Sequence, residues 1–264
     1  MGFFSWLKSL RKPKKIKLGL ALGSGGAKGF AHLGALKAFE ENGIEFDVVA
    51  GTSIGSIVGA FYANGYTSTD ISELLKRINF ADIANAFMLK MDTSGLFDVI
   101  EKNIGALDIE ELKKPFFAIA TELDTGDEKV FSNGSVAKAL CASSSMPPFF
   151  KPVIIDGVRY IDGAFVNSVP ADVVKNAGAD YVVGIDLSTR DAKPSALTKL
   201  FPTYQSKVSE PWATGYKFSD VMLHPNLTDY SAVSFYAGDK MYDIGYQTAL
   251  EQIPKIKQDL KKLK

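Results

Sequence analysis

Two glycine-rich turns near the start of the sequence constrain the fold of this chain more than any other feature. Residues 16–22 alternate in the manner of a buried strand, residues 23–29 form a glycine cluster, and residues 30–41 have helical spacing. Residues 47–63 repeat this order, with a short strand, a second glycine-containing turn and a helix of small residues. Strands that pass through tight turns into helices, twice in succession, are typical of parallel strands joined by crossover helices.

The rest of the sequence continues this alternation. Further strands are expected at residues 115–123, 129–132, 158–161 and 181–187, and further helices at residues 136–143 and 170–176. Residues 190–220 are the least regular part of the chain. We therefore predict an α/β fold with three layers, α/β/α, around a central, mostly parallel sheet.

Composition narrows the class of protein. With 264 residues, of which 46% are hydrophobic, the chain can bury one substantial core, and we predict one main domain over residues 16–264. The formal net charge is zero, so we expect no nucleic-acid partner. Cys141 is the one cysteine, which excludes a disulfide within the chain. No apolar run is long enough to cross a bilayer.

The second glycine turn carries a candidate nucleophile. Gly51-Thr52-Ser53-Ile54-Gly55 matches the G-x-S-x-G pattern, in which a serine is exposed at a sharp strand-to-helix turn. The helix that begins there directs the positive end of its dipole towards a developing oxyanion. The pattern also occurs by chance, and small residues also serve helix packing. Ser53 is the candidate that this turn provides.

The glycine cluster at residues 23–29 is a candidate anion site. Backbone amides in such a loop can bind an anion, and an acyl-transfer enzyme needs donors where a carbonyl oxygen becomes negative. A dinucleotide-binding loop begins in the same way, but Lys28 occupies its third glycine position. A phosphate-binding P-loop needs Ser or Thr after Lys28, where this chain has Gly29. The cluster therefore favours an oxyanion loop.

A candidate general base follows a later strand. Asp162 and Gly163 come directly after the strand expected at residues 158–161. A carboxylate at this place can accept the proton of a serine. Taken alone, Asp-Gly is also an ordinary turn.

The two histidines leave a catalytic triad as an alternative. His32 lies in the helix after the glycine cluster, where we expect it to pack, and His224 lies where we expect a strand to end. The order Ser53, Asp162, His224 fits an α/β-hydrolase. That fold usually presents its elbow after several strands, whereas here the elbow follows the second. Serine with aspartate alone is the simpler hypothesis.

Three motifs in this order resemble those of the patatin-like phospholipases, in particular their compact bacterial members. Residues 25–29 match the family's G-G-x-[RK]-G motif, with Lys28 where arginine is more frequent. Residues 51–55 match its serine motif, and residues 162–164 match its D-G-[GA] motif. The resemblance covers about residues 16–190 and, more weakly, the chain to about residue 250.

The resemblance implies the patatin-like form of the three-layer fold and a Ser-Asp dyad that hydrolyses fatty-acyl esters of phospholipids or lysophospholipids. By this analogy Ser53 attacks the ester carbonyl and Asp162 receives its proton. The amides of Gly25, Gly26 and Ala27 would form the oxyanion hole, and water would release the fatty acid. The resemblance implies no metal and no other cofactor.

Other functions and properties stay open. An acyltransferase or a thioesterase would use the same acyl-enzyme with a different acceptor or leaving group. A non-catalytic membrane adaptor would keep the fold without the reaction, although the intact motif residues argue against it. The head group, the acyl position, the chain length and the oligomeric state, with a homodimer among the options, are not determined by the sequence.

Two apolar segments are candidates for substrate binding. One surrounds the turn at residues 93–95, and the other follows the loop before the Asp162 strand. Lipid sites are largely apolar, although core packing explains such residues equally well. The candidate substrate-binding residues are Met88, Phe97 and Phe149.

The N-terminal segment, residues 1–15, has the pattern of an interfacial anchor. On a helix, one face would carry four apolar side chains, and a basic cluster follows at residues 11–15. The four are Phe3, Trp6, Leu7 and Leu10. The order of apolar and charged residues is the reverse of a secretory signal. We expect a cytoplasmic protein that binds the anionic inner face of the cell membrane peripherally. The basic tail at residues 255–264 is either a second contact or a solvated helix.

Overall fold

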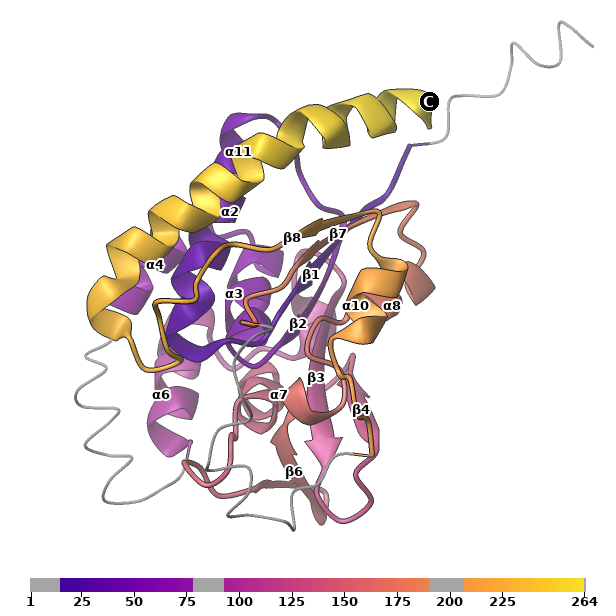
Figure 1. The fold of residues 1–264 in the computed structure, drawn as a ribbon. Helices are drawn as coiled ribbons and strands as arrows, with labels where there is room; N and C mark the ends of the chain where they lie inside the picture. The colour runs from indigo at the N-terminus through magenta and orange to yellow at the C-terminus, as the bar shows by residue number, and fades with distance from the viewer. Residues whose placement is uncertain (1–14, 78–92, 190–206, 264) are drawn as a thin grey trace, which may run out of the picture.

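The computed structural model describes residues 15–77, 93–189 and 207–263 (Figure 1). Residues 1–14 of the expected anchor, residues 1–15, and the candidate Met88 lie outside these ranges. No helix within them is long and apolar enough to cross a membrane.

One eight-stranded sheet forms the centre of the described chain. Its strands follow the order β5-β6-β3-β2-β1-β7-β8, and β4 also pairs with β3. Neighbours from β3 to β8 along this order are parallel, whereas β4 and β6 are antiparallel to β3 and β5 is antiparallel to β6. The predicted α/β class is confirmed, with a sheet that is parallel in the middle and antiparallel towards the β5 edge. The strands are β1 (Leu18–Leu22), β2 (Val48–Thr52), β3 (Phe116–Glu122), β4 (Glu128–Phe131), β5 (Val153–Ile155), β6 (Val158–Asp162), β7 (Tyr181–Ile185) and β8 (Val221–Leu223).

Helices cover both faces of the sheet, which gives three layers (Figure 1). On one face lie α2 (Phe30–Glu41), α3 (Ile54–Ala63), α4 (Ser68–Arg77), α6 (Ser94–Ile104), α7 (Val136–Ser143) and α11 (Gly238–Lys262). On the other lie α8 (Ala171–Asn176) and α10 (Ala213–Phe218). Short 3-10 turns are η1 (Gly26–Gly29), η2 (Ile109–Glu111), η3 (Gly163–Phe165) and η5 (Phe235–Ala237).

The two-residue period of the strands separates the two cores. In β1, Leu20 and Leu22 pack in the larger cluster under α2, α3 and α11, whereas Ala21 between them packs in the smaller cluster under α8. All three side chains are fully buried. The strand was recognisable in the sequence because leucines, which face the larger core, alternate with glycine or alanine, which face the smaller one.

Helix α11 is the main element that the sequence did not predict. It lies along α2 in backbone contact, because a Cβ on Gly34 would collide with the Tyr242 carbonyl and a Cβ on Gly245 with the Ala31 carbonyl. Ile256 near its end is fully buried. The C-terminal tail is therefore helical up to Lys262, and it packs on the core through Ile256 while most of its other side chains face solvent.

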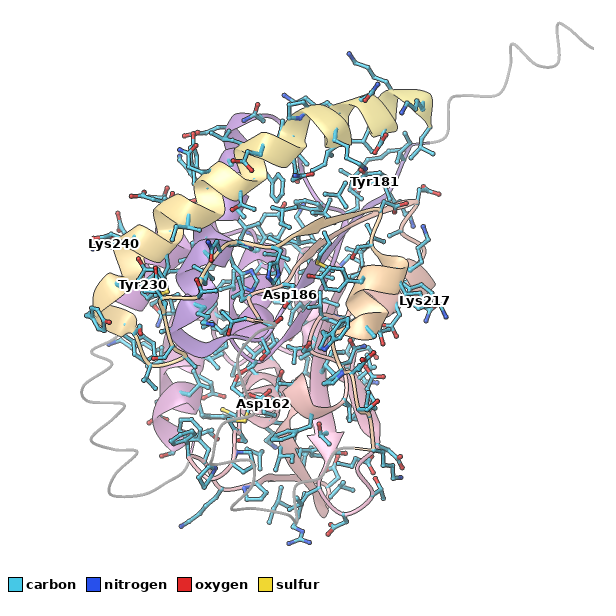
Figure 2. The ribbon with its side chains drawn as sticks, in the orientation of Figure 1. Asp162, Tyr181, Asp186, Lys217, Tyr230 and Lys240 are labelled. Atoms are coloured by element: carbon cyan, nitrogen blue, oxygen red, sulfur yellow. The ribbon has the colours of Figure 1, made fainter. Side chains whose placement is uncertain are left out.

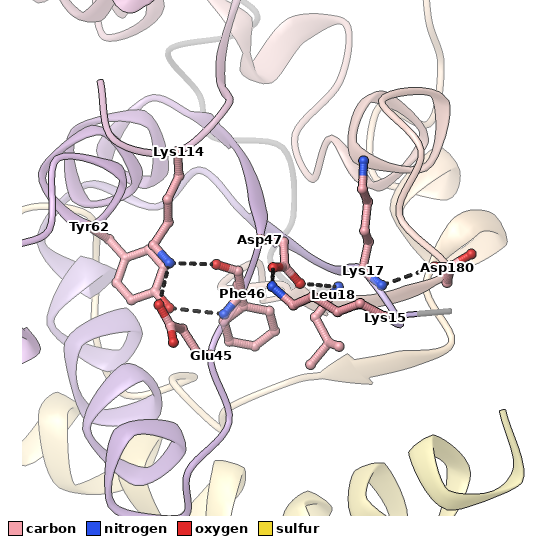
Figure 3. Close-up of polar contacts among 9 residues, drawn as sticks. All are labelled: Lys15, Lys17, Leu18, Glu45, Phe46, Asp47, Tyr62, Lys114 and Asp180. Carbon is pink, nitrogen blue, oxygen red and sulfur yellow. Dashed lines mark hydrogen bonds and ion pairs between the residues drawn. The ribbon is translucent and has the colours of Figure 1, made fainter. Parts of the chain in front are cut away.

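The chain enters β1 at the amino edge of the sheet (Figure 3). Asp47 holds this entry, accepting the Leu18 N–H through Oδ2 at 3.0 Å and pairing with Lys15 Nζ through Oδ1 at 2.5 Å. Asp180 accepts the Lys17 N–H at 2.9 Å. Lys15, the first described residue, thus lies at the edge opposite to the carboxyl ends of the parallel strands.

Candidate active site

Ser53 occupies a sharp turn at the carboxyl edge of the sheet. It lies between β2 and α3 with φ 55° and ψ −126°. A positive φ is uncommon for a residue with a side chain and costs on the order of 1–3 kcal/mol. A Cβ on Gly51 would collide with the Gly55 carbonyl, and a Cβ on Gly55 would collide with the Leu22 carbonyl of β1. The spacing of the motif is therefore a steric requirement of this turn.

Hydrogen bonds with Ser56 of α3 and with two other segments hold the strained turn. The Ser53 N–H donates to Ser143 Oγ at 2.9 Å, and the Ser53 carbonyl accepts the Ser56 hydroxyl at 2.6 Å. The Thr52 hydroxyl donates to the Asn167 carbonyl at 2.7 Å. Ser143 was not among the sequence candidates, and the serine run at residues 143–145 was the available signal.

The strand register brings Asp162 to the same edge. In the β2–β3 pairing Thr52 is level with Ile119, so Ser53 is level with Ala120, the next residue of β3. Ala120 in turn pairs with Asp162 at the end of β6. Two motifs separated by more than a hundred residues therefore meet across one strand.

Asp162 is a fully buried carboxyl group. Its Oδ1 accepts the Ala164 N–H at 2.8 Å, whereas Oδ2 is buried without a hydrogen-bond partner. Burial raises the pKa of Asp162 from 3.8 to about 7, and the Ser53 side chain and the Ala164 N–H oppose this rise. The Ser53 hydroxyl is thus close enough to stabilise the carboxylate without being aligned as a donor to Oδ2. A carboxyl group with a pKa near neutral is suited to general-base chemistry.

The glycine loop after β1 leaves two amides unpaired. Within the described ranges no acceptor lies in hydrogen-bond geometry with the N–H of Gly25 or Gly26. The N–H of Ala27, by contrast, donates to the Ala232 carbonyl at 2.8 Å. Gly26 has φ +58°, and a Cβ there would lie 2.5 Å from the same carbonyl oxygen. Of the three predicted oxyanion donors, Gly25 and Gly26 are unpaired and Ala27 is engaged.

His32 packs beneath this loop, as expected from the sequence. It is fully buried, and its Nε2 lies 2.7 Å from the Gly23 carbonyl oxygen. Burial lowers the pKa of His32 to about 4, so the ring is neutral near pH 7. Because a carbonyl oxygen only accepts, Nε2 carries the proton and donates. His32 supports the glycine loop from inside the core.

His224 belongs to a second polar group, which sequence reasoning missed. Its Nδ1 lies 3.6 Å from Asp186 Oδ2 and 3.3 Å from the Tyr216 hydroxyl, so its contacts are with Asp186 rather than Asp162. Asp186 also accepts the Ser188 N–H and hydroxyl, each at 2.9 Å. Burial would raise the pKa of Asp186, but the donors, led by His224, bring it below its ordinary value. Figure 2 shows Asp186 and Asp162 at separate places in the fold.

Lys28 of the glycine loop interacts electrostatically with Asp186 of this group. Its side chain is buried, which lowers its pKa, while the charge of Asp186 acts in the opposite direction. In the sequence, Asp186 could have been noticed as an acidic residue at the end of an otherwise apolar strand.

The substrate-binding candidates are only partly described. Phe97 on α6 is half-buried and packs against the larger core cluster. Phe149 before β5 is 36% exposed. In the part of the chain that the structure describes, no group of three or more His, Cys, Asp or Glu side chains is arranged to hold a metal ion.

Comparison with known proteins finds relatives of this chain. The neuropathy target esterase sws of Drosophila melanogaster is 32% identical over an alignment of 187 residues, which covers 66% of this chain and 13% of the fly protein. An uncharacterised NTE family protein of Mycobacterium bovis is 30% identical over an alignment of 193 residues, which covers 70% of this chain and 53% of that protein. The chain therefore spans only part of the length of the curated relatives that it matches.

A solved structure shares the fold. VipD from Legionella pneumophila superposes with a TM-score of 0.56 at 15% identity, over 91% of this chain and 67% of that chain. The sequence model of the patatin-like phospholipases matches residues 20–175, which include both glycine turns and Asp162. This match covers more than half of the chain, and the chain therefore belongs to the patatin-like phospholipase family.

Proposed function

We propose that this protein is a serine lipid acyl hydrolase that cleaves fatty-acyl esters of phospholipids or lysophospholipids. The observation that carries the proposal is the buried Asp162 carboxyl, with its raised pKa, beside a serine on a strained elbow. Family membership supports the reaction class, because the family is named for phospholipase activity. The roles of individual residues are inferred from the geometry and the motifs.

In the proposed first half-reaction Ser53 Oγ attacks the carbonyl carbon of the ester. Its proton passes to Asp162 Oδ2, the carboxyl oxygen without a partner. The carbonyl oxygen becomes an oxyanion, held by the N–H groups of Gly25 and Gly26 and by the positive end of α3. When the tetrahedral intermediate collapses, the alcohol leaves with the proton from Asp162, and an acyl-enzyme remains on Ser53.

The second half-reaction regenerates the enzyme. Water attacks the acyl-enzyme carbonyl and gives a proton to Asp162. The second tetrahedral intermediate then expels Ser53 Oγ, which recovers the proton, and the fatty acid is released. No metal is needed in this scheme, and the same dyad serves both steps.

The decisive experiment compares substrates that share an acyl group. A fluorophosphonate probe should label the parent protein at Ser53 and fail to label Ser53→Ala. A panel of phospholipid, lysophospholipid, monoacylglycerol and acyl-CoA then separates hydrolase from acyltransferase and thioesterase, with release of free fatty acid as the readout. Absence of labelling in the folded parent would favour the alternative of a non-catalytic membrane adaptor.

We also propose that residues 1–15 bind anionic lipid and keep the enzyme peripheral on a cytoplasmic membrane face. Their basic cluster supports this, since each cation near an anionic surface contributes on the order of 1 kcal/mol. Lys15 already pairs with Asp47, so the other cations carry the proposal. We predict that a chain beginning at Ile16 sediments less with anionic vesicles at low salt than the full chain does. Equal sedimentation of the two forms would contradict the anchor.

A further inference from the structure

The segment between β8 and α11 contains a turn, Ser231–Ala237, that forms part of the rim of the glycine loop. Its Ala232 carbonyl accepts the Ala27 N–H at 2.8 Å and lies 2.5 Å from the position of a Cβ on Gly26. Gly238, directly after the turn, packs against the Phe30 ring at the start of α2. In Figure 1 the orange segment that leads into α11 passes beside the indigo start of α2. A surface that binds this turn is therefore brought next to the proposed oxyanion site.

Serine side chains fix the inner side of the turn. The Ser231 N–H donates to Ser234 Oγ at 3.0 Å, and the two hydroxyl oxygens are 3.0 Å apart. Ser234 and Ala237 are buried. These contacts hold the turn in one shape, so that its outward side chains keep a fixed direction.

The outer side of the turn is apolar and exposed. Val233 is 70% exposed and Tyr236 is 88% exposed, the two highest values among the large hydrophobic side chains of the described residues. Ala232 beside them is also exposed. Residues 231–238 carry no charged side chain, although Asp229 and Asp239 flank them. An uncharged turn that displays a valine and a tyrosine outward is suited to entering an interface between water and lipid.

We propose that the turn Ser231–Ala237 is a lipid-contact element, whose Val233 and Tyr236 side chains enter the surface of the bilayer that holds the substrate. The inference rests on the proposed function, because a lipid acyl hydrolase must meet its substrate in a bilayer or micelle. Tyrosine suits this place because its ring is apolar and its hydroxyl remains with water and head groups. Lys240, exposed on the first turn of α11, lies on the same side of the molecule as Tyr230 and can face anionic head groups (Figure 2).

A lipid surface fits this turn better than a protein partner does. A stable protein interface buries about 800 Å² on each side, which two side chains and an alanine do not supply. A bilayer accepts single side chains, and each one buried adds to the binding. The contact would also reach the edge of the domain that carries Ser53, whereas Lys15, the first described residue, lies at the opposite edge.

Site-specific fluorescence quenching tests the contact directly. In the full chain with Trp6→Phe and Trp212→Phe, one new tryptophan is placed by Tyr236→Trp or, as the matched control, by Leu263→Trp. These positions flank the two ends of α11, whose 25 residues separate them by about 37 Å at 1.5 Å per residue. Leu263 is 51% exposed, so both positions tolerate the change. The probe is a vesicle of phosphatidylcholine and phosphatidylglycerol with brominated acyl chains, and sedimentation gives the bound fraction.

We expect the bound Tyr236→Trp variant to be quenched several-fold more strongly than the bound Leu263→Trp variant. Equal quenching, no quenching of bound protein, or stronger quenching at position 263 would overturn the proposal. Failure of the full chain to bind the vesicles would overturn it as well. None of these outcomes depends on hydrolysis.

An activity assay separates this inference from the proposed function. The double variant Val233→Ser with Tyr236→Ser should lose about tenfold in hydrolysis of vesicle phospholipid, in line with the apolar area it removes, and keep turnover of a soluble short-chain ester within about twofold. Leu263→Ser should change neither activity. Equal loss on both substrates would mean that the turn acts only through its packing on the glycine loop, which contradicts lipid contact. If the parent hydrolyses neither substrate, the proposed function fails, and quenching still decides the contact.

Discussion

Replacing Asp162 with Asn tests the proposed base and its energetic cost together. The amide keeps the shape of the carboxyl and an oxygen for the Ala164 N–H, but it removes the charge and the ability to accept the serine proton. Burial raises the pKa of Asp162 from 3.8 to about 7, so the folded protein holds a charge above pH 7 that its surroundings disfavour. Asp162→Asn should therefore lose activity and gain stability.

The size of the gain follows from linkage between protonation and folding. Well below pH 4 the carboxyl is protonated in both the folded and the unfolded chain, and it has no effect on their balance. As the pH rises to about 7, the unfolded chain loses the proton first, which destabilises the folded state by about 1.4 kcal/mol per pH unit. The shift of about three units then gives a plateau of about 4 kcal/mol. This is the largest gain in the free energy of unfolding that Asp162→Asn can produce at pH 8.

The assay is urea denaturation of both proteins at pH 4, pH 6 and pH 8, with unfolding monitored by circular dichroism. The difference in the free energy of unfolding should grow from nearly zero at pH 4 to its maximum at pH 8. Turnover of a soluble ester by the variant should fall by ~10²–10⁴, the usual contribution of a general base. The parent's kcat/KM should itself decline below pH 7 as Asp162 becomes protonated.

Asp186→Asn is the matched control, because Asp186 is also buried but its pKa is lowered. A carboxyl with a lowered pKa stabilises the folded state at neutral pH, and this contribution is lost as the pH falls. Asp186→Asn should thus destabilise the protein at pH 8 and do so less at pH 4. If Asp162→Asn instead destabilised the protein at pH 8, or changed its stability equally at all three pH values, the assignment of Asp162 as a strained buried base would be refuted.

Three further predictions concern the dyad, the two histidines and the acyl site. Ser53→Ala should abolish ester hydrolysis with the fold intact, and adding Asp162→Asn should make it no worse, because the two residues act as one unit; near-normal turnover by Ser53→Ala would contradict this. His32→Ala and His224→Ala, assayed on a soluble ester, should each keep turnover within about tenfold, whereas losing a general base costs ~10²–10⁴; a loss at His224 as severe as at Ser53, in a folded variant, would favour a triad. Phe97→Ser should shift the chain-length preference in a competition between short and long acyl esters if α6 lines the acyl site, and unchanged selectivity would assign Phe97 to the core alone.

Local features of this protein could be predicted from the sequence because their causes are local. The bounds of α2 and α7 agree with the predicted ranges, since helical spacing and flanking residues are properties of short segments. The Ser53 elbow was recognisable because its glycines are required by backbone collisions within and just beside the turn. Strand β2 extends into the elbow motif itself, up to Thr52, because a strand's end is set by pairing with its neighbours.

Features of the site that depend on contacts between distant parts of the sequence were missed or were predicted only in part. The donor role of Ala27 looked equal to those of Gly25 and Gly26, but the Ala232 carbonyl, far along the chain, engages its N–H. The donors around Asp186 come from a loop, a helix and a strand end that no sequence period connects.

The sequence by itself determined which groups carry the proposed chemistry: a serine on an elbow, an aspartate after a strand and a glycine loop with amides to offer. The identity of a side chain and the conformational freedom of a glycine are properties of single residues, so a short sequence motif specifies both. The tertiary structure alone decided which of these groups meet, which amide is already engaged and how far burial raises the pKa of Asp162. Proximity and desolvation depend on how the strands align and on what covers them, and these are properties of the packed chain as a whole.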